Sequence, residues 1–195
     1  MKLAILLHMF DLTLLPEFYD YISNIGKAGY KYDVYIAISD KYDLAAFKTY
    51  WPKAVVIHHE DRGMDVGGFF ALCPSLFRSK YDYVLKLHTK RNAKWRKALI
   101  EPLLGTPERV RRGITAFAPG VGMVGSKSWL ITMGKDWGIY NHHINSITEV
   151  WGVPKTTCKF IGGTIFWIRY SILREAMNKV NIPTCLLYTS DAADE

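Results

Sequence analysis

Residues 83–91 read Tyr-Val-Leu-Lys-Leu-His-Thr-Lys-Arg, a β-forming run in which apolar and polar side chains alternate. A strand with this alternation places Lys86, His88 and Lys90 on one side of the strand and its exit. Strand interiors normally avoid charge. A Lys and a His that leave a strand together therefore predict a polar site at its carboxyl end. The alternative is an edge strand, because edge strands use Lys to discourage pairing with other chains.

Other β-forming runs flank this segment and alternate with stretches of helical period. This alternation predicts an α/β fold with a mostly parallel, open sheet covered by helices on both faces. We expect strands over Lys2–Met9, Tyr32–Ile38, Ala54–His58, Tyr83–His88, Val121–Val124 and Phe160–Arg169. We expect helices over Pro16–Ile25, Leu44–Tyr50, Asp65–Ser79, Lys94–Leu104 and Pro107–Phe117.

A chain of 195 residues suits one domain, which we expect over residues 1–184. Residues 185–195 break the pattern and resemble a translated sequencing adapter, so we expect a non-native tail there. The apolar run Met1–Phe10 is too short to cross a membrane and lacks a signal-peptide cleavage site. We therefore interpret that run as a buried strand.

The formal charge of +7 implies an anionic partner, and nucleic acid, anionic lipid headgroups and nucleotide diphosphates all fit. The basic residues bunch within Lys86–Lys97 and again at Arg109, Arg111 and Arg112, which is not the layout of a nucleic-acid-binding motif. The first cluster favours a local anion site. The second is equally explained as a solvated helix face.

The three cysteines, Cys73, Cys158 and Cys185, form no C-x-x-C pair. Neither a disulfide framework nor a zinc site is indicated, and the compartment is expected to be reducing. We expect a cytoplasmic location, with peripheral contact at the inner face of the cell membrane as an option.

Ligands of open α/β sheets bind beyond the carboxyl ends of the strands, so the residues that follow each strand are candidates. Arg62, Gly63 and Asp65 lie at the start of an expected helix, where a glycine permits a tight turn and backbone N–H groups favour anions. Asp65 is equally explained as the N-cap of that helix.

Gly162 and Gly163 interrupt a strongly β-forming run. Glycines in such a position predict that a ligand or another backbone comes close. Trp167 is placed to pack beneath a sugar ring, although core filling is the commoner role of such a residue. Together with Thr164, these residues are our candidates for contacts with an acceptor or its sugar.

Three motifs resemble those of the rhamnan synthesis protein F family, which is associated with bacterial surface polysaccharides. Residues 61–66, Asp-Arg-Gly-Met-Asp-Val, look like the family's Asn-Arg-Gly-Arg-Asp-Val motif. Residues 81–90 look like Tyr-Asp-Tyr-x-x-Lys-x-His-Thr-Lys, and residues 162–167 look like Gly-Thr-Met-Phe-Trp. Trp95-Arg96 and residues 121–125 follow in the expected order.

Two departures from the family pattern stand out. Asp61 and Met64 replace the family's Asn and Arg, which puts a role for those two side chains in doubt. The family's His- and Glu-containing segment after the last motif has no counterpart in this sequence, and a base could lie there.

The resemblance implies a glycosyltransferase A-type fold and transfer of a sugar to a growing cell-surface polysaccharide or lipid-linked acceptor. The implied donor is rhamnose on deoxythymidine diphosphate. Many enzymes of this fold hold a divalent ion with an Asp-x-Asp pair, but the corresponding strand here ends in Lys-x-His-x-Lys. We therefore expect Lys86, His88 and Lys90 to stabilise the leaving diphosphate without a required metal.

The remaining candidates complete this hypothesis. Asp65 is the expected general base. His8, Asp40, Arg62 and Gly63 are the expected further contacts to the donor. For His8 the alternative is a half-buried histidine with all its hydrogen bonds satisfied.

Two other classes of function stay open. A non-catalytic module that binds a nucleotide-sugar or a glycan would keep the pocket and lack a base. A nucleic-acid-binding protein would place the charges between Lys86 and Arg112 on phosphates. A dinucleotide-dependent oxidoreductase is disfavoured, because no G-x-G-x-x-G follows the first strand.

Overall fold

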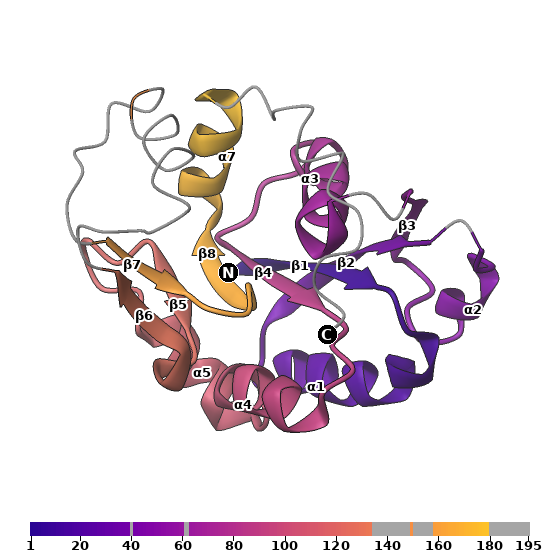
Figure 1. The fold of residues 1–195 in the computed structure, drawn as a ribbon, viewed down its shortest axis with the longest axis horizontal. Coiled ribbons are helices and arrows are strands. Elements are labelled where there is room, and N and C mark those ends of the chain that lie inside the picture. The colour runs from indigo at the N-terminus through magenta and orange to yellow at the C-terminus, as the bar shows by residue number, and fades with distance from the viewer. Residues whose placement is uncertain (40, 61–62, 134–148, 150–157, 180–195) are drawn as a thin grey trace.

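The computed structural model describes residues 1–39, 41–60, 63–133, 149 and 158–179. The chain has an α/β fold built on an open six-stranded sheet of order β3-β2-β1-β4-β8-β5 (Figure 1). Its parallel strands are β1 (Lys2–Met9), β2 (Lys31–Ile38), β3 (Val55–His58) and β4 (Tyr83–His88). Strand β8 (Phe166–Arg169) runs antiparallel to β4 and to β5 (Met123–Gly125). The predicted fold class is confirmed.

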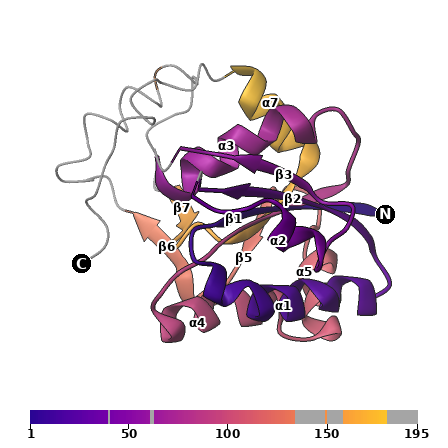
Figure 2. The same cartoon turned by 90° about the vertical axis from the view of Figure 1, so that its right-hand side faces the viewer.

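Helices cover both faces of the sheet (Figure 2). One face carries α1 (Leu15–Lys27), α4 (Ala93–Leu104) and α5 (Pro107–Thr115). The other carries α3 (Met64–Leu76) and α7 (Tyr170–Lys179), and the short α2 (Ala45–Lys48) follows β2. No helix within these described residues is long and apolar enough to cross a membrane.

Side-chain alternation in the strands divides the core in two. In β1, Leu3, Ile5 and Leu7 enter the core beneath α1, whereas Ala4 and Leu6 enter the core beneath α3. Helix α1 seals its face with apolar residues at helical spacing, and each of them is completely buried: Phe18, Ile22 and Ile25.

The prediction of one strand over Phe160–Arg169 is wrong. The segment forms β7 (Cys158–Ile161), a turn and β8, and β7 pairs with β6 (Leu130–Met133) in a separate two-stranded sheet. The backbone explains the split, because Gly163 has φ 78° and Thr164 has φ 52°, which a strand cannot accommodate. Strand β6 and helix α7 were not predicted, and residues 185–195 lie outside the described part.

The direction of the chain connections changes between β1 and β4, since β2 and β3 lie on one side of β1 and β4 on the other. Ligands of open α/β sheets bind at such a switch point. Thr89 ties the two strand exits together here, because its Oγ1 accepts the N–H groups of Phe10 (2.9 Å) and Asp11 (3.3 Å). Strand β4 lies between β1 and β8, so it is an interior strand and the edge-strand alternative is wrong.

Candidate functional site

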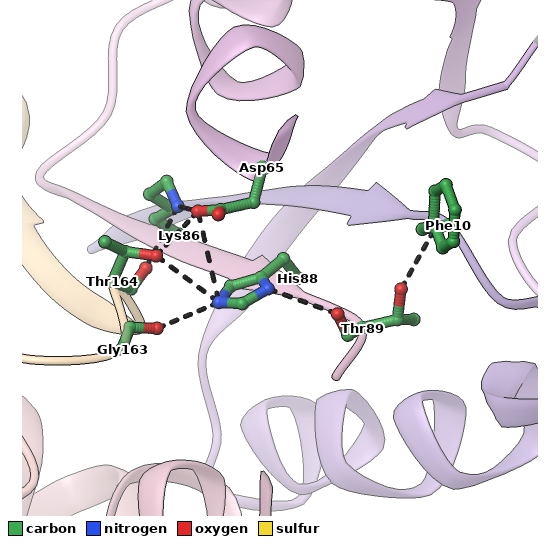
Figure 3. A network of polar contacts seen from close by, with 7 residues as sticks. All are labelled: Phe10, Asp65, Lys86, His88, Thr89, Gly163 and Thr164. Atoms are coloured by element: carbon green, nitrogen blue, oxygen red, sulfur yellow. Dashed lines mark hydrogen bonds and ion pairs between the residues drawn. The ribbon is translucent and has the colours of Figure 1, made fainter. Parts of the chain in front are cut away.

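Four polar residues meet beside the carboxyl ends of β1 and β4 and form what we call the carboxyl-edge network: Asp65, Lys86, His88 and Thr164 (Figure 3). The Oδ2 atom of Asp65 accepts hydrogen bonds from Lys86 Nζ and from Thr164 Oγ1 (2.6 Å). Lys86 Nζ also donates to the backbone carbonyl of Thr164 (3.1 Å). The structure therefore brings the β4 motif, the α3 motif and the Gly-Gly segment together.

The start of α3 directs Asp65 to this place. Gly63 is the N-cap, in the left-handed conformation with φ 69°, and its carbonyl accepts the N–H of Gly67 at 2.7 Å. Asp65 consequently lies in the first turn, where the helix dipole favours a carboxylate. The alternative that Asp65 is merely the N-cap is wrong.

Backbone strain accompanies the network. Among the described residues, Met64 and Thr164 are the non-glycine residues with positive φ, at 52° each. This conformation costs a non-glycine residue about 1–2 kcal/mol. Strain of this kind clusters at functional sites, where the surrounding structure maintains it. Met64 adjoins Asp65 in sequence, and Thr164 is a member of the network.

Opposite charges dominate the electrostatics of the pair between Asp65 and Lys86. Burial opposes ionisation of Asp65, but the charge of Lys86 and side-chain hydrogen bonds from Lys86 and Thr164 outweigh it and hold the pKa of Asp65 well below its usual range. Burial lowers the pKa of Lys86, while Asp65 opposes that shift. The side chain of Lys86 is only 3% exposed and that of Asp65 19% exposed. Because the Asp65 carboxylate pairs with the Lys86 ammonium, Lys86 is not a free cation.

His88 is buried and turned towards the Gly-Gly turn. Its Nε2 lies 2.8 Å from the carbonyl oxygen of Gly163, so the neutral ring carries its proton there. Burial lowers the pKa of His88 and keeps the ring neutral near pH 7. Its Nδ1 lies 3.2 Å from the carbonyl oxygen of Thr89, a second acceptor that only the protonated ring can serve.

His8 lies beside His88, because the two residues are register partners on neighbouring parallel strands. Its residue exposure is 5%, and burial lowers its pKa to about 4. Within the described chain, its buried Nε2 has no hydrogen-bond partner. The alternative of a half-buried, satisfied histidine is wrong.

Lys90 continues the alternation beyond β4 but contacts a different group. Its Nζ lies 3.4 Å from the ring centroid of Trp95, in the first turn of α4. Thr89 was not among the predicted site residues, although it stands inside the His-Thr-Lys motif. Its link between the two strand exits is visible only in the structure.

One of the predicted acceptor residues needs a correction. Trp167 is completely buried in the core, so it does not offer a ring to a sugar. Gly162 and Gly163 lie close to side chains of the protein itself. A Cβ on Gly162 would lie 2.8 Å from Ile131 Cδ1, and one on Gly163 would lie 2.6 Å from Leu99 Cδ1.

Two predicted donor contacts, Asp40 and Arg62, lie outside the described residues. The described residues contain no group of three or more His, Cys, Asp or Glu side chains arranged to hold a metal ion. The carboxylate of the network, Asp65, is already neutralised by Lys86, and this donor set does not fit a divalent cation.

The second basic cluster lies on α5, away from the network. Arg111 and Arg112 are exposed, Arg111 pairs with Glu108 at 3.2 Å, and Arg109 lies 3.6 Å from Glu101. These contacts are typical of a solvated helix face.

Comparison with known proteins identifies one family and two relatives. The sequence profile of the family described as rhamnan synthesis protein F matches residues 1–183. The chain is 30% identical over 136 residues to the uncharacterized protein WxcX of Xanthomonas campestris pv. campestris strain B100. It is 29% identical over the same length to WxcX of a second strain of that pathovar. Each alignment covers 65% of this chain and 19% of the relative, so the chain spans about a fifth of their length.

Proposed function

This chain belongs to the rhamnan synthesis protein F family, a family of polysaccharide synthesis, and we propose that it is the donor-binding domain of a glycosyltransferase. The proposed reaction moves a sugar, rhamnose by family resemblance, from a nucleotide diphosphate to a growing cell-surface polysaccharide. The acceptor hydroxyl oxygen bonds to the anomeric carbon, the bond to the diphosphate breaks, and a base takes the hydroxyl proton.

The carboxyl-edge network is the observation that carries this proposal. A buried ion pair costs desolvation energy, and a fold that needed only stability would gain as much from apolar residues there. The network lies at the switch point of the sheet, beside two residues in strained backbone conformations. Lys86 has three N–H donors, and its contacts to Asp65 and Thr164 leave one for an oxygen of the donor.

The role of Asp65 needs its own test. A catalytic base works best with a pKa near the working pH, and the low pKa of Asp65 makes it a weak proton acceptor. If Asp65 is the base, Asp65→Asn abolishes turnover and leaves donor affinity unchanged. If Asp65 positions Lys86 and Thr164, the same substitution weakens donor binding as well. A non-catalytic binding module would show neither turnover nor its loss.

A thermal-shift screen of nucleotide sugars on the full chain tests the proposal. A ligand at one hundred times its Kd stabilises the folded state by about 2.7 kcal/mol, which raises the Tm of a chain of this size by roughly 5 °C or more. We expect that shift with deoxythymidine diphosphate rhamnose, and we expect it to persist in excess chelator. Absence of a shift with every nucleotide sugar would reject the donor site, and loss on chelation would reject the metal-free version. Lys80→Ala is the matched control, because Lys80 is exposed and lies before the amino end of β4, at the end of the strand opposite the network.

A further inference from the structure

We propose that the ring of Phe10 is the surface on which the base of the nucleotide donor stacks, and that Thr89 and Tyr42 are positioning residues that hold this ring in place. This inference rests on the proposed function, since it assigns the part of the site that meets the nucleoside. In that function the carboxyl-edge network meets the diphosphate, so the base of the donor lies to one side of the network.

Phe10 directly follows β1 at the switch point of the sheet. Its side chain is half-buried, and neither hydrophobic core of the described residues includes it. Aromatic side chains contribute to stability mainly by the area that they bury in a core. The ring of Phe10 does not make that contribution, and part of it is open to a ligand.

Side chains from the two neighbouring strand exits fix the backbone of Phe10. Thr89, directly after β4, accepts the N–H of Phe10 through its Oγ1 at 2.9 Å. Tyr42, four residues after β2, donates its hydroxyl to the carbonyl oxygen of Phe10 at 3.0 Å. Both polar backbone groups of Phe10 are therefore bonded, and the ring is placed before a ligand arrives, which lowers the entropy cost of binding.

Thr89 also joins Phe10 to the carboxyl-edge network (Figure 3). The backbone carbonyl oxygen of Thr89 lies 3.2 Å from His88 Nδ1, and its N–H donates to the carbonyl of His8 at 3.1 Å. Phe10 lies two residues beyond His8, so the chain separates them by at most about 7 Å. The ribose of a nucleotide separates its base from its phosphates by a comparable length. A base on Phe10 therefore allows the diphosphate to reach the network.

Two cationic side chains lie over the ring of Phe10. The Nζ atom of Lys41 is 4.8 Å from the ring centroid, and the Cζ atom of Arg91 is 5.8 Å from it. Both residues are exposed, and stacking of a base on an aromatic ring is stronger than an exposed cation–π contact. A base can therefore displace either side chain from the ring.

Phe10→Leu in the full chain tests the stacking surface, because leucine keeps an apolar side chain and lacks the ring. We expect deoxythymidine diphosphate rhamnose to bind the variant roughly fivefold to fiftyfold more weakly, the effect of one lost base stack. Inorganic pyrophosphate, which has no base, should bind both proteins alike. Phe77→Leu is the matched control and should bind the donor as the wild type does. Phe77 is also half-buried, but it lies at the C-cap of α3, at the opposite end of that helix from Asp65.

A double-mutant cycle tests the positioning role. Thr89→Val and Tyr42→Phe each remove a hydrogen bond to the backbone of Phe10, and each should weaken donor binding roughly twofold to fivefold. In a Phe10→Leu background neither substitution should have a further effect. Equal losses in both backgrounds would overturn the positioning role.

Proton NMR of the bound donor tests the contact directly, because stacking on Phe10 must shift the ring and methyl protons of thymine upfield. Phe10→Leu should abolish that shift. Three results would overturn the inference and leave the proposed function intact: unchanged donor affinity in Phe10→Leu, equal losses for donor and pyrophosphate, or an upfield shift that is absent from the wild type or persists in the variant. Failure of the wild-type chain to bind any nucleotide sugar would remove the proposed function instead.

Discussion

The amino ends and the carboxyl ends of the parallel strands, here called the amino edge and the carboxyl edge, carry networks with the same chemistry and different surroundings. At the amino edge, Asp33 Oδ2 binds Lys2 Nζ (2.7 Å) and accepts the hydroxyl of Tyr81 (2.7 Å). At the carboxyl edge, Asp65 Oδ2 likewise accepts from Lys86 and from the hydroxyl of Thr164. The side chains of Lys2 and Asp33 are 47% and 46% exposed, against 3% and 19% for Lys86 and Asp65.

This difference in burial separates a solvent-screened ion pair from a desolvated one. Water screens the amino-edge pair, so that pair contributes little and costs little. The carboxyl-edge pair is desolvated, so it is held only because both partners are present. In α/β sheets of this kind the carboxyl edge is the ligand-binding edge, and the costly network stands on that side.

Removal of each lysine is the strongest test of the contrast. Lys86→Met leaves the Asp65 carboxylate buried without its partner, and we expect a loss of about 3–5 kcal/mol in unfolding free energy. Lys2→Met should cost at most about 1 kcal/mol. Urea denaturation measures both. Equal losses would contradict the comparison, and Lys86→Met with Asp65→Leu should recover part of the loss.

Stability should fail at opposite extremes of pH. The unfolded chain protonates His8 at about 6.5, whereas the folded protein keeps it neutral down to about 4, so stability falls as pH drops through this window. By linkage the loss is roughly 3 kcal/mol. The lowered pKa of Asp65 extends the loss of stability to pH values below 3.8, the ordinary pKa of an aspartate.

The amino edge has the reverse dependence. Burial, with hydrogen bonds to Tyr35 and Asp33, raises the pKa of Tyr81 far above the ordinary tyrosine value of 10.0, so stability is lost as pH rises beyond 10.0. Thermal melting across pH checks both limbs. His8→Asn should flatten the acid limb alone and Tyr81→Phe the alkaline limb alone, and any other pattern would assign the titration to different groups.

Two glycines give a smaller contrast. Gly29 at the amino edge and Gly163 at the carboxyl edge both have positive φ, at 92° and 78°. A Cβ on Gly29 meets nothing within 4 Å, whereas one on Gly163 meets the buried Leu99 at 2.6 Å. Gly29→Ala should therefore cost only the backbone strain of about 1–2 kcal/mol, and Gly163→Ala about 1–2 kcal/mol more. Chemical denaturation decides whether the two losses differ.

Loss of one hydroxyl is the mildest test. Thr164→Val removes a hydrogen bond to an ionised carboxylate and should cost about 2 kcal/mol, whereas Tyr35→Phe removes its neutral bond to Tyr81 (2.6 Å) and should cost about 1 kcal/mol. The same substitutions should differ in donor binding, which we expect only Thr164→Val to weaken. Weaker binding in Tyr35→Phe would show that the amino edge reaches the site.

Local patterns were enough for most of the fold. The bounds predicted for β1 and β4 agree with the structure, since both strands have an uninterrupted β-forming sequence. The segment Phe160–Arg169 misled the prediction, because its residues favour strands on both sides of a turn that only backbone dihedrals reveal. The role of the Trp167 ring was ambiguous for a different reason, because its burial depends on α4 and α5, which are far away in sequence.

The sequence by itself determined which polar side chains leave the carboxyl ends of the strands, because a period of two assigns each residue to one face. Only the tertiary structure decided what those side chains contact. Lys86 meets an aspartate 21 residues away and a carbonyl 78 residues away, and Lys90 is held by a ring and a guanidinium on the next helix. Net charge and pKa at a site depend on such long-range neighbours and on burial, which no local pattern contains.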